Sequence, residues 1–165
     1  MNKIIELKNV TKRFGGITAL NSASLHVNKG EGVGLIGDNG AGKSTLIDAL
    51  CYSLYGKAFR DISTPQLINS VNSNHMEVEC TFRTAKRTYT VKRGLKPRFF
   101  EVWQDGKMLN QDASARDYQE ILEKQILKIN HKSFKQIVVL GSSSFVPFMQ
   151  LHSKDRKLHQ IEMTL

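Results

Sequence analysis

The sequence predicts a fold of the α/β class, of mixed α+β type, in which one helix packs on a mixed sheet that includes an antiparallel meander. Two observations predict this fold. A short apolar run and a helical pattern lie on either side of the glycine-rich residues 37–44, and segments of strand character alternate with turns between residues 76 and 109. No linker or internal repeat divides the 165 residues, so residues 1–165 are expected to form a single lobe.

Two strands are predicted ahead of the glycine-rich loop. Residues 3–8 alternate apolar and polar side chains, as expected for a strand with one buried face. Residues 12–16 predict a turn, and residues 18–27 predict a second, less regular strand. The turn formers in residues 28–31 then end this strand.

The glycine-rich loop itself is predicted to join a strand to a helix. Residues 33–36 are a short apolar run that is typical of a buried strand. Residues 45–55 place apolar side chains near one helical face, and Gly56 is a suitable residue to stop this helix. Residues 60–74 are rich in turn formers and predict a surface loop with one short buried turn.

An antiparallel meander is predicted next. Residues 76–82 alternate apolar and polar side chains, and residues 87–93 predict a second strand with Tyr89 and Val91 pointing inward. Residues 99–104 predict a third strand. The dipeptide Asp105-Gly106 is a strong hairpin signal that leads to a short fourth strand.

The C-terminal part is predicted to contain helices around one more strand. Ser114 opens a capping box, and apolar side chains at helical spacing predict a helix over about residues 115–128. The β-branched residues in 136–141 predict a core strand. Residues 153–165 predict a final helix that Ser153 caps.

Residues 37–44, Gly-Asp-Asn-Gly-Ala-Gly-Lys-Ser, fit the phosphate-binding pattern G-x-x-x-x-G-K-[ST]. Glycines bring backbone N–H groups close to phosphate oxygens, and the N-terminus of the following helix adds its positive dipole end. Lys43 would reach the β- and γ-phosphates, Ser44 would ligate Mg²⁺, and Thr45 would contact the α-phosphate. The residues predicted to bind ATP and Mg²⁺ are Gly37, Asn39, Gly40, Ala41, Gly42, Lys43, Ser44 and Thr45. A glycine-rich turn with a chance Lys-Ser pair is the alternative.

Composition predicts a cytoplasmic protein with a polyanionic partner. The formal net charge is +9. No stretch approaches the roughly 20 apolar residues of a membrane span, and charges close to Met1 argue against a signal peptide. Cys51 and Cys80 lack metal-type spacing and are predicted to be reduced core thiols.

The positive charge is concentrated between residues 80 and 100, where no acidic residue occurs. A stripe of Lys and Arg on a sheet face is the electrostatic footprint of nucleic-acid binding. The residues predicted to contact DNA are Arg87, Lys92, Arg93, Lys96 and Arg98. The alternative is a solvated edge, because lysines on edge strands also prevent aggregation.

Two family resemblances meet in this chain. Residues 4–47, with the run 7–16, Ala19-Leu20, Lys29-Gly30-Glu31 and the glycine-rich loop, resemble the N-terminus of an ABC-transporter ATPase. In that family an aromatic side chain at the Phe14 position stacks on adenine, and such stacking is worth about 1–3 kcal/mol. A core or loop aromatic is the alternative for Phe14.

From residue 43 onward the sequence resembles the SMC-like recombination ATPases of the SbcC and T-even phage endonuclease-subunit type. The resemblance lies in residues 42–49, 54–57, 59–61, 66–70, 91–94, 133–141, 147–149 and 155–157. It implies that Gln136 is the Q-loop glutamine, which contacts Mg²⁺ and the attacking water. It also implies that residues 153–165 begin a coiled coil. An ordinary polar residue at a strand start is the alternative for Gln136.

Two parts that these families use for hydrolysis do not occur in the sequence: an apolar run that ends in Asp-Glu, and the signature that caps the γ-phosphate of a facing subunit. We therefore expect an N-terminal ATPase lobe that is inactive alone. The resemblance implies as partners a C-terminal ATPase lobe or second head, a nuclease subunit and DNA. The alternatives are a transporter fragment that partners a membrane permease and a folded but inactive fusion.

Overall fold

A computed structural model of the chain describes residues 3–14, 17–67, 76–84, 86–109 and 115–137. The chain divides into two compact units, residues 1–112 and residues 113–165. The first unit holds the sheet and the helix that follows the glycine-rich loop, and the second holds the C-terminal helices. This confirms the predicted α/β class, and the units are described separately below.

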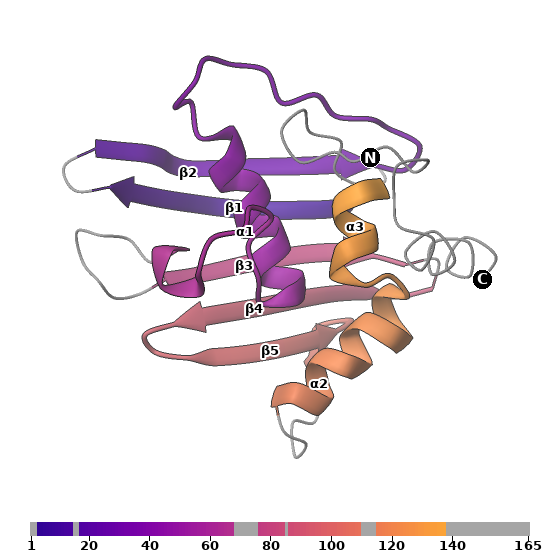
Figure 1. The fold of residues 1–165 in the computed structure, drawn as a ribbon. Coiled ribbons are helices and arrows are strands. Elements are labelled where there is room, and N and C mark those ends of the chain that lie inside the picture. Colours follow the sequence, from indigo (N-terminus) through magenta and orange to yellow (C-terminus); the bar gives the residue numbers. More distant parts are fainter. Residues whose placement is uncertain (1–2, 15–16, 68–75, 85, 110–114, 138–165) are drawn as a thin grey trace, which may run out of the picture. The chain divides into compact units, whose positions relative to one another are not determined.

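The first unit is built on a six-stranded sheet with the order β2-β1-β3-β4-β5-β6 (Figure 1). Every strand pair among the described residues is antiparallel, whereas the sequence predicts a mixed sheet. The strands are β1 (Lys3–Phe14), β2 (Ile17–Asn28), β3 (Met76–Arg83), β4 (Thr88–Leu95), β5 (Phe99–Gln104) and β6 (Lys107–Met108). β1 is longer than predicted, because it continues to Phe14 where the sequence predicts a turn.

The meander forms as the alternation predicts. Val78, Cys80 and Phe82 of β3 are buried, and so are Tyr89 and Val91 of β4. β3 and β4 pair in unbroken register, so these side chains come together on one face. Asp105 and Gly106 both have positive φ, as the predicted two-residue hairpin between β5 and β6 requires.

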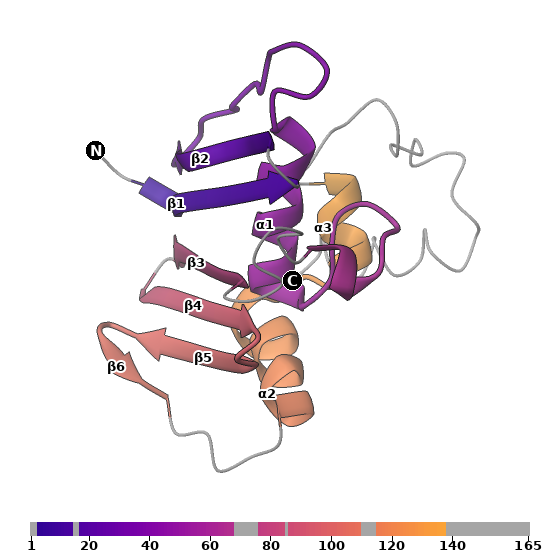
Figure 2. The ribbon, with the colours of Figure 1, turned by 90° about the vertical axis from the view of Figure 1, so that its left-hand side faces the viewer.

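Helix α1 (Lys43–Tyr55) covers one face of this sheet (Figure 2). It contacts strands β1 to β4, and its last ten residues, apart from Ile47, are buried. Gly56 ends the helix as predicted, because its φ of 67° is easily adopted only by glycine, and its N–H donates to the Tyr52 carbonyl at 2.8 Å. The short helix η1 (Thr64–Leu67) then supplies the predicted turn, with Leu67 buried.

One predicted strand of the first unit is wrong. Residues 33–36 are neither helix nor strand, and Val33 and Ile36 are exposed, Ile36 to 97%. A strand is stabilised by hydrogen bonds to a neighbouring strand, and no described strand pairs with these residues. The apolar run of residues 33–36 was therefore not sufficient to form a strand.

The second unit contains α2 (Ala115–Ile121), the π-helical turn η2 (Leu122–Leu127) and α3 (His131–Ile137). Together α2 and η2 confirm the helix predicted over residues 115–128. The strand predicted at 136–141 is wrong where the structure describes it, since Gln136 and Ile137 belong to α3. The rest of this segment and the helix predicted at 153–165 lie outside the described residues.

The start of α3 explains that correction. Asn130 caps this helix, because its Oδ1 accepts from the Ser133 N–H at 3.0 Å and its carbonyl accepts from the Phe134 N–H at 2.9 Å. Buried Phe134 and Ser133 lie in the first turn. The cap therefore starts a helix before the β-branched run that predicted a strand.

Candidate nucleotide-binding site

The glycine-rich loop folds into a tight turn directly ahead of α1. Gly40 and Gly42 have φ values of 91° and 85°, a conformation that side chains with a Cβ rarely adopt. The Ala41 N–H donates to the Asp38 carbonyl at 3.1 Å, which closes the turn. The Leu46 N–H donates to the Gly42 carbonyl at 3.0 Å, so the helix follows the loop without a break.

The N-terminus of α1 has the properties of an anion site. No side chain caps it, and its first turn contains no acidic residue. A capping oxygen or a carboxylate would compete with a phosphate for the free N–H groups of this turn. Ser44 and Thr45 lie in the same first turn, next to Lys43.

Lys43 folds back over the loop. Its Nζ donates to the Asp38 carbonyl at 2.9 Å and also to the Gly37 carbonyl. Backbone carbonyls are weaker partners for an ammonium group than phosphate oxygens, which carry full charge. These residues are therefore suited to bind the phosphates of a nucleoside triphosphate. Ser44 supplies the hydroxyl that would hold its Mg²⁺.

A buried carboxylate that the sequence analysis missed joins α1 to the loop that follows this helix. Asp48 lies in α1 and is 1% exposed. Its Oδ1 accepts from the backbone N–H groups of Phe59 and Arg60, each at 3.1 Å. Its Oδ2 accepts from the Arg60 guanidinium, with Nε at 2.8 Å. A lone acid on the apolar face of a predicted helix was the signal that could have found it.

Arg93 connects α1 to the sheet. Its Nε donates to the Ser53 carbonyl at 3.1 Å, and its guanidinium lies 3.7 Å from the centre of the Phe100 ring. It also lies 5.9 Å from the centre of the Tyr52 ring. Arg93 is one of the residues predicted to contact DNA. In the structure its side chain packs between the helix and the meander, which is the position of a residue that stabilises the fold.

The remaining predicted DNA contacts lie in different surroundings. Lys92 pairs with Glu79 at 3.1 Å and lies over the Trp103 ring, and Arg87 pairs with Asp105 at 2.9 Å. Lys96 and Arg98 are exposed on either side of Pro97. The structure therefore does not join the five into one stripe.

Burial or hydrogen bonding shifts the pKa values of three side chains in the first unit. Burial raises the pKa of the Cys80 thiol to about 12, and burial also raises the pKa of Tyr52. The Thr88 N–H and then the Arg87 guanidinium hold the pKa of Asp105 below its usual value. Cys51 and Cys80 are buried and form no disulfide among the described residues, which confirms the prediction of reduced core thiols.

Two predicted site residues lie apart from the loop in the chain. Phe14 ends β1, and its side chain is not among those described. Gln136 lies on α3, in the second unit. The structure therefore gathers the residues predicted to bind phosphate in one loop and helix turn, and the roles of all the predicted site residues, Phe14 and Gln136 included, stay predictions.

Comparison with known proteins identifies the family of the chain. The family model described as AAA domain matches residues 20–164. The chain belongs to this family. No described helix of this AAA domain is long and apolar enough to cross a membrane.

Individual relatives confirm both resemblances. Exonuclease subunit 2 of Escherichia phage RB69 is 41% identical over 137 residues, which are 83% of this chain and 24% of that protein. The same subunit of Enterobacteria phage T4 is 40% identical over the same shares. The xylose import ATP-binding protein XylG of Histophilus somni is 51% identical over 51 residues, 31% of this chain and 10% of that protein. The chain thus spans about a quarter of the length of the phage relatives.

Proposed function

We propose that this AAA domain is the ATP-binding N-terminal lobe of a cytoplasmic DNA recombination and repair ATPase that acts with a nuclease subunit on DNA ends. The observation that carries the proposal is the uncapped N-terminus of α1 behind a loop in which Lys43 contacts only backbone carbonyls. Similarity to two phage exonuclease subunits supports the nuclease context.

The lobe binds ATP and Mg²⁺ through the phosphate-binding loop and does not hydrolyse ATP alone. Gln136 would contact Mg²⁺ and the attacking water in the complete head, and Phe14 would stack on adenine. The sequence holds no Asp-Glu pair after an apolar run to activate that water.

A C-terminal ATPase lobe or a second head is the proposed partner of the exposed segment 33–36. Val33 and Ile36 are exposed, and an exposed apolar run next to a binding loop indicates a surface that another chain segment covers.

The alternative is the ATP-binding subunit of an ABC transporter with a membrane permease as partner. The 51% identity to a xylose import protein favours it over a short stretch. That function predicts a short helical insertion after α1. The basic meander β3 to β5 at this point favours the recombination ATPase instead.

Nucleotide binding is tested by titrating a fluorescent ATP analogue into the chain with Mg²⁺ present. We expect saturable binding, a loss of at least tenfold in affinity for Lys43→Ala, and no change for Lys57→Ala, which removes an exposed lysine just beyond α1. Equal affinity of the Lys43→Ala variant would contradict the site. ATP hydrolysis that Lys43→Ala abolishes would contradict the expected inactivity.

A further inference from the structure

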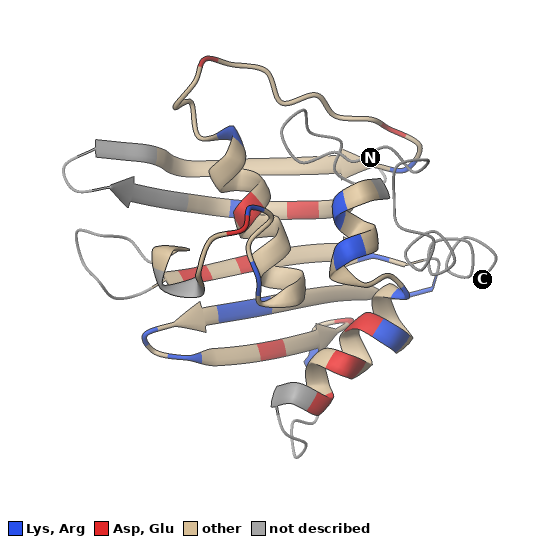
Figure 3. Ribbon diagram, viewed as in Figure 1, with Lys and Arg blue, Asp and Glu red and all other residues tan. Residues whose placement is uncertain are grey.

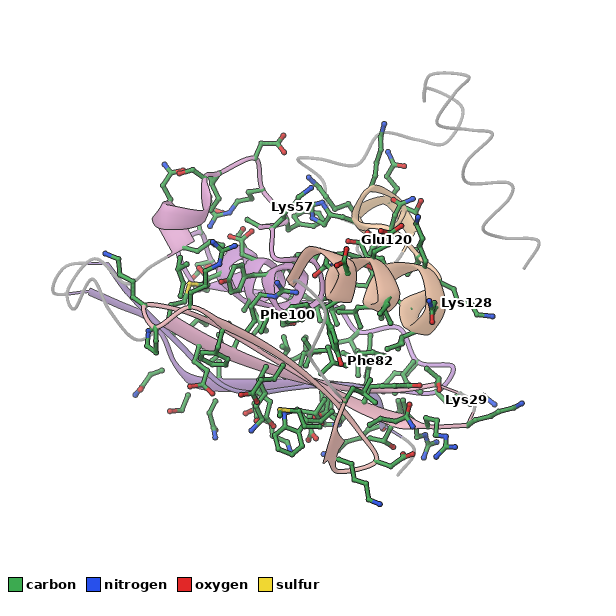
Figure 4. All side chains as sticks on the ribbon, turned by 90° about the horizontal axis from the view of Figure 1, so that it is seen from below. Lys29, Lys57, Phe82, Phe100, Glu120 and Lys128 are labelled. Carbon is green, nitrogen blue, oxygen red and sulfur yellow. The ribbon has the colours of Figure 1, made fainter. Side chains whose placement is uncertain are left out.

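The strongest feature outside the nucleotide site is a basic hollow at one end of the sheet. Its volume is about 680 Å³. Four of its lining residues are cationic: Lys29, Arg83, Lys86 and Arg87. Figure 3 shows blue segments at this end of β3 and β4, and Lys29, labelled in Figure 4, comes from the turn after β2. Two separate parts of the chain thus direct positive charge to one place.

Hydrogen bonds join the described residues on the two sides of the β3–β4 turn, next to three of these cations. The Thr84 N–H donates to the Arg87 carbonyl at 2.9 Å, and the Arg87 N–H donates to the Thr84 hydroxyl at 3.2 Å. Asp105 accepts from the Thr88 N–H at 3.0 Å and from the Arg87 guanidinium.

The charge of the hollow is only partly neutralised. Asp105 pairs with Arg87, but no ion pair joins Lys29, Arg83 or Lys86 to any residue that the structure describes. Uncompensated cations in a concave surface raise the local potential and attract anions. The hydroxyl of Thr88, another lining residue, adds an uncharged group of the kind that contacts phosphates.

We propose that this hollow binds the phosphate backbone of double-stranded DNA, with Lys29, Arg83 and Lys86 as the main contacts. The proposal rests on the proposed function for its partner, and it replaces the predicted stripe with a cluster that includes only Arg87 of the original residues. A single small anion gains little from solvent-exposed cations because salt screens them. A polymer gains from each contact, since every neutralised phosphate releases a counterion.

The test is binding of a labelled blunt duplex to the full chain, followed by fluorescence anisotropy across a range of salt. The three main contacts predict a slope of log affinity against log salt of about −2.7. Arg83→Ala with Lys86→Ala should reduce the slope by about 1.8 and weaken binding roughly 50-fold at 0.1 M salt. Lys29→Ala, on a different turn, should reduce the slope by about 0.9.

The matched control is Lys96→Ala with Arg98→Ala, which removes the same charge at the opposite end of β4. This control should keep the slope and affinity of the parent chain. Equal losses in both double variants would overturn the proposal in favour of net charge, and a loss only in the control would assign DNA to the Pro97 loop. Absence of duplex binding by the parent chain would also overturn it.

Two further measurements separate the possible failures. Inorganic phosphate should displace the duplex no better than chloride at equal ionic strength, and specific displacement would make the hollow a small-anion site instead. The Arg83→Ala, Lys86→Ala chain should keep its thermal midpoint and its affinity for the ATP analogue. If the parent chain binds the ATP analogue but not the duplex, only the proposal that the hollow binds DNA is overturned. If the parent chain does not bind the ATP analogue, the proposed function is overturned.

Discussion

Helix α1 and the segment 31–42 are consecutive in the chain, yet tertiary contacts hold them very differently. The helix buries Leu54 to 2% exposure against the sheet, whereas Ile36 is 97% exposed. The sequence predicts buried structure both for the helix and for residues 33–36 of the segment. The difference shows that an apolar pattern becomes an element only where a partner surface is available, and α1 has four strands as its partner.

The largest change in the free energy of unfolding is expected for a buried residue of α1. Leu54→Ala should lower the free energy of unfolding by about 3–4 kcal/mol, because it removes buried methyl groups and leaves a cavity. Ile36→Ala should change it by less than about 0.5 kcal/mol. Urea unfolding followed by circular dichroism measures both. Similar losses for the two variants would mean that residues 31–42 are packed in solution.

Asp48→Ala tests the polar contact between α1 and the loop that follows it. The change leaves two backbone N–H groups and the Arg60 guanidinium without their acceptor, and we expect a loss of about 2–3 kcal/mol. The side chain of Arg60 is 46% exposed, which keeps the loss below that of a fully buried pair. Lys124→Ala, which breaks the exposed pair with Glu120, is the matched control and should cost less than about 0.5 kcal/mol. A loss under 1 kcal/mol for Asp48→Ala would show that the loop does not depend on this carboxylate.

Substitution of two glycines tests how strongly the backbone is constrained at the end of α1 and in the segment 31–42. Gly56→Ala places a side chain at a φ of 67° and 2.9 Å from Arg93 Nη1, so we expect a loss of about 1–2 kcal/mol. Gly32 has neither a positive φ nor a neighbour within 4 Å, and Gly32→Ala should be close to neutral. Thermal unfolding of the two variants measures both changes in stability. An unaffected Gly56→Ala chain would exclude the left-handed helix end.

The smallest effect concerns pH. The folded pKa of Cys80, about 12, is above its ordinary value of 9.0, so the neutral thiol is favoured in the folded state. The stability it provides is complete below pH 9 and is lost as the pH rises toward 12. Between pH 7 and 8 the change should be under about 0.1 kcal/mol. At pH 8 the folded chain should not react with a disulfide thiol reagent, whereas the chain in urea should. Rapid labelling of the folded chain would contradict the burial of Cys80.

The sequence predicted the features that depend on near neighbours. Alternation in residues 76–82 gave the correct buried face of β3, and Asp105-Gly106 gave the correct hairpin. The tight turn of the glycine-rich loop was also predictable, because Gly40 and Gly42 adopt positive φ values that glycine favours. Each of these features is set by a few consecutive residues, whatever packs against them.

Contacts between distant residues were decided only by the tertiary structure. The partner of Asp48 is Arg60, the position of Arg93 depends on α1, and the basic hollow joins Lys29 to the β3–β4 hairpin. Residues 33–36 remain without a strand because no described strand pairs with them. Local sequence determined which elements can form, and long-range packing determined which of them did, since hydrogen bonds and burial need a second surface.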